Sequence, residues 1–153
     1  MRVYLVRHAA AVPEDAQTKD ADRWLSAPGR DDAGKLGRML SDESVRFARV
    51  FSSPLVRAVQ TAEVLCAALG HAGVVETRAT LAPGCQPEVA AREIAALGQD
   101  TLVVGHEPGI SALAALLVGQ PGFESFRKGQ VVLIDGGKPV WRMTPASSGA
   151  QPL

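Results

Sequence analysis

Cysteine and aromatic residues are scarce in this sequence, and no long hydrophobic run is present. Only two cysteines occur among 153 residues, Cys66 and Cys85, and their spacing fits neither a redox C-x-x-C motif nor a metal-binding motif. We therefore expect both to be small apolar residues without a function of their own. No apolar run approaches the length of about 18 residues that a membrane-spanning helix requires, so we expect no membrane partner.

The chain also lacks an excess of charge of either sign. Sixteen Lys and Arg residues balance sixteen Asp and Glu residues, which gives a formal net charge of zero. An even mixture of charges argues against general affinity for nucleic acids, so any anion binding must be local. The first apolar run begins at Val3 and leaves no room for a cleaved signal peptide, so we expect a cytoplasmic protein.

Signatures of cofactor and metal binding are absent too. The sequence contains no Walker A motif and no G-x-G-x-x-G motif, which disfavours nucleotide binding through a glycine-rich loop. His8 and His106 are not four residues apart on one helix, and no carboxylate accompanies them at ligand spacing. We therefore expect no cofactor and no metal ion.

Three short apolar runs each lead to an arginine or a histidine. Each run is rich in β-branched residues, which is typical of a strand buried on both faces of a parallel sheet. Ligands of open α/β sheets bind beyond the carboxyl ends of the strands, so the side chains after these runs should meet there. The runs are residues 3–6 before Arg7 and His8, residues 50–51 before Arg57, and residues 102–104 before His106 and Glu107.

Predicted helices separate these strands. Ser26 is a good N-cap for a helix that ends near Ser41, and Ser53 followed by Pro54 predicts a second helix start, with Gly70 as its end. Strand and helix alternation predicts an α/β, three-layer sandwich, with a mostly parallel central sheet of about six strands and helices on both faces. The expected strands are residues 3–6, 45–51, 73–77, 101–104, 130–134 and 140–143, and the other expected helices are residues 88–97 and 106–119.

Two segments are expected to lie outside this framework. Residues 11–24 lack periodicity and form a predicted loop directly after His8, in which Arg23 is the residue we expect to point toward the site. Residues 146–153 are rich in Pro, Ser and Gly and are predicted to be a flexible tail. The remaining residues 1–145 then form a single domain.

The residues after the strands suit a phosphoryl group. Arginine offers permanently charged, bidentate donors, and a neutral imidazole can act as a nucleophile. Arg57 falls in the first turn of its predicted helix, where a cation opposes the helix dipole. A bound anion between the helix N-terminus and the guanidinium would remove that conflict.

The three blocks resemble the histidine phosphatase superfamily, whose fold is called phosphoglycerate mutase-like. The resemblance extends over most of the chain, to about residue 145, and implies a hydrolase. Chain length and several further segments are similar to the small SixA branch of that superfamily, the phosphohistidine phosphatases. The superfamily resemblance is carried by residues 6–9, 52–62 and 104–108, and the branch resemblance by residues 23–26, 81–84 and 141–145.

The resemblance implies a role for each residue that matches the motifs. His8 would be the nucleophile that becomes transiently phosphorylated, and water would then hydrolyse the phosphoenzyme. Ala9 departs from the glycine common in the superfamily and implies slightly less room beside the nucleophile. The residues expected to hold the phosphoryl oxygens and the substrate are Arg7, Arg57 and His106, with Glu107 and Arg23 as further substrate-binding candidates.

A second departure bears on the substrate. Many members place an acidic general acid shortly after the third strand, and residues 81–84 contain no carboxylate. This disfavours alkyl phosphate esters, whose leaving alkoxide is very basic, whereas phosphohistidine leaves as imidazole once its other nitrogen is protonated, with a reference pKa of about 6.5. Glu88 and Glu107 stay open as proton donors. We expect a metal-independent phosphatase that acts on a histidine-phosphorylated phosphorelay or phosphotransfer protein.

Other functions stay open at this point. The same chemistry would serve a phosphomonoesterase for a small molecule such as a phosphosugar or nucleotide. A non-catalytic phosphoprotein-binding module is disfavoured because all four core residues are present, and a mutase because no enclosing insertion is evident. The predicted connections are short, so we expect an open site without a lid.

Overall fold

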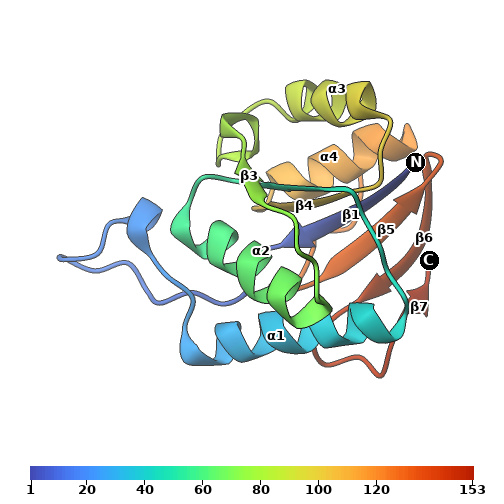
Figure 1. The fold of residues 1–153 in the computed structure, drawn as a ribbon. Coiled ribbons are helices and arrows are strands. Elements are labelled where there is room, and N and C mark those ends of the chain that lie inside the picture. The colour runs from blue at the N-terminus through green and yellow to red at the C-terminus, as the bar shows by residue number, and fades with distance from the viewer.

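A seven-stranded sheet runs through the middle of the molecule, with two helices on each face (Figure 1). The computed structural model describes all residues, 1–153. The strands are β1 Arg2–Arg7, β2 Arg49–Ser52, β3 Val75–Thr77, β4 Thr101–Gly105, β5 Val131–Asp135, β6 Lys138–Met143 and β7 Gln151–Pro152. The helices are α1 Ala27–Asp42, α2 Val56–Leu69, α3 Pro87–Leu97 and α4 Gly109–Val118, with short 3-10 turns η1 Asp20–Asp22 and η2 Ala79–Leu81.

The sheet is half parallel and half antiparallel. Its strand order is β3-β2-β4-β1-β5-β6-β7; the pairs from β3 to β1 are parallel, and those from β1 to β7 are antiparallel. The prediction of an α/β sandwich is confirmed. The prediction of a mostly parallel sheet holds only for this first half, and the sheet has seven strands where about six were expected. The short connections from β5 to β6 and from β6 to β7 allow only antiparallel pairing of these strands, because a parallel crossover needs a dozen or more residues.

Strand β1 lies inside the sheet and contributes to both hydrophobic cores. Val3 and Leu5 pack into the core on the α3 and α4 side, and Tyr4 and Val6 pack into the core on the α1 and α2 side. All four side chains are at most 2% exposed. This alternation follows from the two-residue period of a strand, and each buried side chain of this size stabilises the fold by about 2 kcal/mol.

The helix starts show one confirmed prediction and one wrong one. The Ser26 hydroxyl accepts a hydrogen bond from Gly29 N–H at 3.1 Å, so it caps α1 as expected. Helix α2 begins at Val56 with no side-chain cap, later than the predicted start at Ser53. The Ser53 hydroxyl accepts from Leu55 N–H at 3.2 Å in the turn before the helix, and its second partner is His106.

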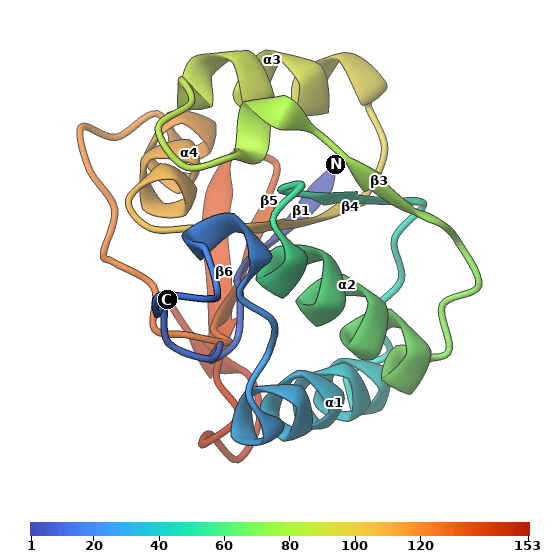
Figure 2. The ribbon, with the colours of Figure 1, turned by 90° about the vertical axis from the view of Figure 1, so that its left-hand side faces the viewer.

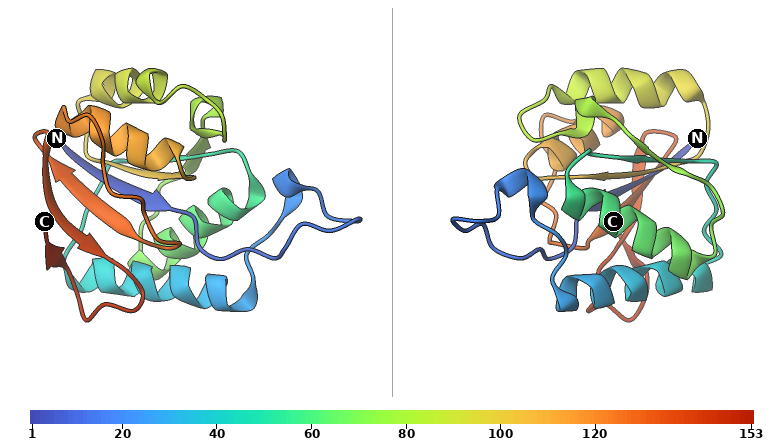
Figure 3. Two further views of the ribbon diagram at one scale, coloured as in Figure 1. Left: turned by 180° about the vertical axis from the view of Figure 1, so that it is seen from behind. Right: turned by 60° about the vertical axis from the view of Figure 1, so that its left-hand side comes forward.

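The carboxyl ends of β1, β4 and β2 lie side by side because these strands are parallel neighbours. Their register pairs Arg7 with Gly105 and Ser52 with Val104. Residues 8–26 leave this edge as a loop that projects from the body of the protein in Figure 3 and faces the viewer in Figure 2. The strand ends, the start of α2 and this loop therefore meet at one edge of the sheet.

The C-terminal segment returns to the far edge of the sheet. Gln151 pairs with Arg142 and Pro152 with Trp141, which makes β7 a short edge strand beside β6. The sequence predicts a frayed tail here, whereas two of its residues form a strand in the structure. The division into a domain of residues 1–145 and a flexible tail stays a prediction.

No helix in the structure combines the length and the apolar character that crossing a membrane would demand.

Candidate active site

Two buried histidines face each other where β1 and β4 end. His8 N–H donates to the carbonyl of Gly105 at 3.0 Å, which continues the β1–β4 pairing by one residue and brings His8 next to His106. The two ring centroids are 5.0 Å apart, with planes inclined at 55°. His8 is 7% exposed and His106 is 6% exposed, so both rings sit largely out of water.

The His8 ring is held in one neutral tautomer. Its Nδ1 lies 2.7 Å from the carbonyl oxygen of Ala9, which can only accept, so Nδ1 carries the ring proton. The pKa of His8 is lowered to about 4, first by burial and then by the charges of Arg57, Arg7 and Lys128, while the hydrogen bond to Ala9 acts in the opposite direction. At neutral pH, Nε2 therefore keeps a free lone pair, as a nucleophile needs.

His106 is oriented by Ser53, which follows directly after β2. Its Nε2 lies 2.7 Å from the hydroxyl of Ser53, which already accepts from Leu55 N–H at 3.2 Å. When the Ser53 hydroxyl donates its proton to Nε2, Nδ1 of His106 becomes the protonated nitrogen and a donor toward an anion. The pKa of His106 is lowered to about 3; burial is the largest cause, and the charges of His8 and Arg57 act in the same direction.

Arg57 enters the site from the first turn of α2, and a carboxylate from the loop holds its guanidinium. It is 4% exposed. Its Nη1 donates to the main-chain carbonyl of Asp20 at 2.7 Å, and its Nη2 lies 3.3 Å from the carboxylate of Asp20. Arg57 thus keeps one fixed orientation with donors to spare for an anion, because a guanidinium carries five N–H groups.

Arg23 joins the site through the same carboxylate. Its Nε and Nη2 each lie 3.0 Å from Asp20 Oδ1, and its Nη1 donates to the carbonyl of Val12 at 3.2 Å. Burial would raise the pKa of Asp20, but the charge of Arg57 and the hydrogen bonds from Arg23 and Arg57 outweigh it and lower that pKa. An ionised Asp20 therefore bridges the two arginines.

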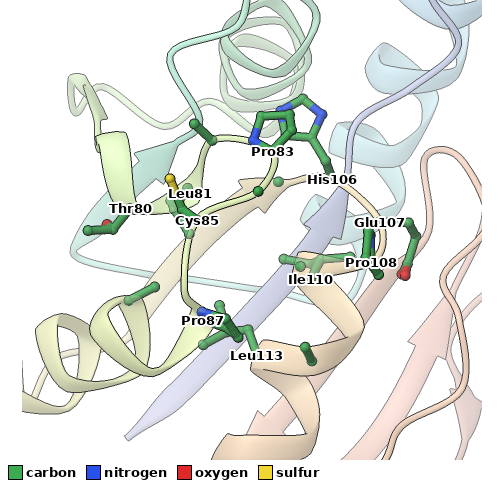
Figure 4. Close-up of a pocket in the computed structure, with 16 residues that line it drawn as sticks. Thr80, Leu81, Pro83, Cys85, Pro87, His106, Glu107, Pro108, Ile110 and Leu113 are labelled. Atoms are coloured by element: carbon green, nitrogen blue, oxygen red, sulfur yellow. The ribbon is translucent and has the colours of Figure 1, made fainter.

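Arg7 is positioned through a relay that includes Glu107. Its Nη1 donates to the carbonyl of Phe126 at 2.8 Å, and Phe126 N–H donates to the carboxylate of Glu107 at 2.9 Å. The other oxygen of Glu107 accepts from the Ser111 hydroxyl at 2.7 Å. The carboxylate points away from His106 (Figure 4), so the structure brings Glu107 near the site without turning it inward.

A loop before β5 closes the remaining side of the site. Gly129 N–H donates to the carbonyls of Arg7 at 3.1 Å and His8 at 3.2 Å, which fixes the loop against the end of β1. Gly129 has a φ of +71°, a conformation that glycine adopts without strain. Lys128, its exposed neighbour, is close enough for its charge to lower the pKa of His8.

Buried donors without a partner concentrate at this site. Across the structure, only four buried side-chain nitrogen or oxygen atoms lack a hydrogen-bond partner, and three belong to this site: Arg7 Nε, Arg57 Nε and His106 Nδ1. A buried unpaired donor costs about 1 to 3 kcal/mol, and more when the group is charged. An anion bound among these residues would satisfy such donors.

The carboxylates that the sequence offers as proton donors are placed elsewhere. Glu88 is exposed on the first turn of α3, and Glu107 is committed to Phe126 and Ser111. No group of three or more His, Cys, Asp or Glu side chains is arranged to hold a metal ion. The arrangement offers a neutral imidazole nucleophile next to fixed cationic donors.

Sequence reasoning missed three residues that shape this site, namely Ser53 as a partner of His106, Asp20 and Lys128. Ser53 was interpreted as a helix cap, and Asp20 and Lys128 look like solvated charges in loops. The order of residues offers no signal for them, because Asp20 and Arg57 are 37 residues apart and Ser53 and His106 are 53 apart.

Comparison with known proteins gives the chain a family context. Residues 3–82 match the model of the histidine phosphatase superfamily (branch 1). The phosphohistidine phosphatase SixA of Escherichia coli K12 is 28% identical over 96% of each chain. An uncharacterized protein of Picosynechococcus sp. strain PCC 7002 is 34% identical over 80% of this chain and 76% of its own. A solved structure of the protein histidine phosphatase SixA with tungstate superposes with a TM-score of 0.87 at 27% identity, over 95% of this chain and 97% of that one.

Proposed function

Because the chain belongs to the histidine phosphatase superfamily and is a phosphatase of the SixA type, we propose that it dephosphorylates phosphohistidine on a phosphorelay or phosphotransfer protein. His8 is the proposed nucleophile. Arg7, Arg57 and His106 are the proposed phosphoryl-binding residues, with Arg23 as a contact at the rim. Glu107 is proposed to act on the substrate through Arg7, and no metal is required.

The proposed first step transfers the phosphoryl group to His8. The lone pair on His8 Nε2 attacks phosphorus, and the P–N bond of the substrate breaks with its electron pair moving onto the substrate nitrogen. The substrate ring, already protonated on its other nitrogen, leaves as neutral imidazole. His8 keeps its Nδ1 proton on the Ala9 carbonyl, so the phosphorylated ring is an imidazolium beside a phosphoryl dianion.

The proposed second step returns the enzyme to its starting form. A water oxygen attacks phosphorus, the bond from phosphorus to His8 Nε2 breaks, and its electron pair goes back to Nε2. Both water protons stay with the phosphate, which leaves as dihydrogen phosphate. Arg7 and Arg57 stabilise the charge on the phosphoryl oxygens in both steps, because fixed cations need no reorganisation during the reaction.

One observation carries this proposal: the unpartnered buried donors on Arg7, Arg57 and His106 surround a histidine whose Nε2 lone pair is free. A neutral nucleophile among permanent cations suits an anionic electrophile. A general binding pocket would not need a buried imidazole whose pKa is about 4.

The choice of phosphohistidine rests on the proton donors. Asp20, whose carboxylate contacts Arg57, is held ionised between two arginines, and Glu107 is turned away from His106. A site with no protonated acid is poorly suited to expel an alkoxide, whereas phosphohistidine supplies its own proton through the second ring nitrogen.

The test is phosphate release, followed with mass spectrometry, from a histidine-phosphorylated phosphotransfer domain. Wild-type protein should remove the phosphoryl group and His8→Ala should not. A panel of phosphosugars and nucleotides, run beside it, covers the small-molecule alternative. Faster turnover of any phosphomonoester than of the phosphorylated domain would contradict the proposed substrate class. Turnover of neither, with an intact fold, would contradict the enzyme assignment.

A further inference from the structure

A cavity opens directly beside His106. It has a volume of about 250 Å³ and lies between the segment that joins η2 to α3 and the first turns of α4 (Figure 4). Gly105 and His106 line it, whereas Arg7 and Arg57 do not. The cavity therefore adjoins the proposed phosphoryl site without sharing its arginines.

The walls of this cavity are mainly apolar. Leucine, isoleucine, alanine and proline carbons form most of the lining, among them Leu81, Pro83, Pro87, Ile110 and Leu113. Figure 4 shows these side chains on both sides of the opening, with His106 at one end. Such a lining favours an apolar group, since its burial removes hydrocarbon surface from water on both partners.

Apart from His106, whose free Nδ1 belongs to the proposed phosphoryl site, the hydrogen-bonding side chains in the lining are already engaged. The Thr80 hydroxyl donates to Glu93 at 2.7 Å, and the Cys85 thiol lies 3.0 Å from the carbonyl of Ala79. Glu107 accepts from Phe126 N–H and the Ser111 hydroxyl. A sugar or a base placed here would lose hydrogen bonds to water without replacement, which argues against a polar metabolite as the occupant.

The size of the cavity also decides between occupants. Pockets that bind drug-sized molecules or cofactors usually measure about 300 to 1,000 Å³, and this one is smaller. A single large aliphatic or aromatic side chain is the matching apolar object of biological origin. A protein that presents phosphohistidine can offer such a side chain on the same surface.

We propose that this cavity is a specificity subsite that receives one apolar side chain of the phosphorylated protein, next to the phosphohistidine held at His8. This inference rests on the proposed function and extends it. The substrate is then recognised at two adjoining points: its phosphoryl group binds the arginines, and its apolar neighbour fills the cavity. Small phosphate compounds engage only the first point.

Two synthetic phosphohistidine peptides test the subsite, one with leucine on both sides of the phosphohistidine and one with asparagine at the same positions. Leucine and asparagine are similar in size, so the pair separates apolar character from bulk. Wild-type protein should hydrolyse the leucine peptide with a kcat/KM about tenfold higher, since burial of one such side chain is worth roughly that factor. Phosphoramidate serves as a P–N substrate without any side chain.

The matched enzyme variants are Ala112→Leu, which fills the cavity from α4, and Ala82→Leu, which fills it from the opposite wall. Ala95→Leu adds the same side chain at an exposed position of α3 outside the cavity. Each filling variant should remove the preference for the leucine peptide and leave phosphoramidate turnover within about twofold of wild type. Ala95→Leu should keep the preference. Circular dichroism confirms that each variant is folded.

The outcomes separate this inference from the function on which it rests. Equal turnover of both peptides by wild type, or an unchanged preference in both filling variants, overturns the subsite and leaves the phosphatase proposal standing. Equal losses on peptide and phosphoramidate overturn it too, because the cavity would then serve the chemistry itself. Turnover of phosphoramidate but of neither peptide overturns both proposals.

Discussion

The parallel and antiparallel halves of the sheet differ in the burial of their polar side chains. The parallel half ends in a cluster of buried polar side chains, and Arg57, 4% exposed, is among them. The antiparallel half carries Arg142 on β6, whose side chain is 37% exposed and pairs with the exposed Glu124 at 2.8 Å. Parallel neighbours end at the same edge and concentrate their side chains, whereas the ends of antiparallel strands alternate between edges.

The largest expected effect comes from His8→Ala, which removes the proposed nucleophile at the end of β1. We expect at least about a 10⁴-fold loss of phosphatase activity and no phosphoenzyme detectable by mass spectrometry, because a displacement through His8 has no substitute. The fold should survive with an unfolding free energy lowered by less than about 2 kcal/mol. His71→Ala, at a histidine outside the site, is the control and should form phosphoenzyme normally. Retained labelling in His8→Ala would refute the nucleophile.

Arg57→Lys and Arg142→Lys compare a buried arginine of the parallel half with an exposed arginine of the antiparallel half. We expect kcat to fall by about 10² to 10³, because lysine cannot reproduce the bidentate geometry that fits a phosphoryl group. Arg142→Lys changes the same residue type in the exposed pair of the antiparallel half and should leave kcat within about twofold. Steady-state kinetics on one phosphohistidine substrate compares the variants. Similar losses at both positions would contradict the assignment of Arg57 to the site.

Stability should depend on pH through the parallel half, because the antiparallel half contains no histidine. The pKa of His8 is about 4 in the folded protein, below its ordinary value of about 6.5, so the unfolded chain binds more protons between these values. The free energy of unfolding should therefore fall as the pH drops from 6.5 toward 4. Between pH 7 and pH 4.5 we expect wild type to lose about 2 kcal/mol more than His8→Asn. Urea denaturation at both pH values measures this, and parallel losses in the two proteins would contradict it.

Asp20→Asn should give the smallest of these effects. The variant loses the charge between Arg23 and Arg57 but keeps the main-chain carbonyl that accepts from Arg57. We expect kcat/KM to fall about tenfold, less than in Arg57→Lys, because the guanidinium remains and only its orientation loosens. Asp22→Asn alters an exposed neighbour in the same turn that makes no side-chain hydrogen bond to either arginine, and should match wild type. Equal kinetics in both variants would show that Asp20 does not position Arg57.

The sequence predicted local structure correctly where residues close together in the chain determine it. The burial of β1 on both faces, the N-cap at Ser26 and the helix stop at Gly70, which has a φ of +79°, all follow from neighbours in the sequence. The predicted strand at residues 45–51 was too long, because β2 begins at Arg49. Val45 and Phe47 are buried, so their apolar character was read correctly, but they pack into the core outside the ladder.

The residue types at the strand ends were determined by the chain alone, since three apolar runs lead to arginine or histidine whatever their order in the sheet. The tertiary structure decided which side chains those groups meet. In the folded protein, the Ser53 hydroxyl contacts His106, and Asp20 lies between two arginines. Glu107 accepts from Phe126 N–H, and an apolar cavity lies beside His106. A side chain's partner depends on the strand order and on loops many residues away, and local propensity carries no information about either.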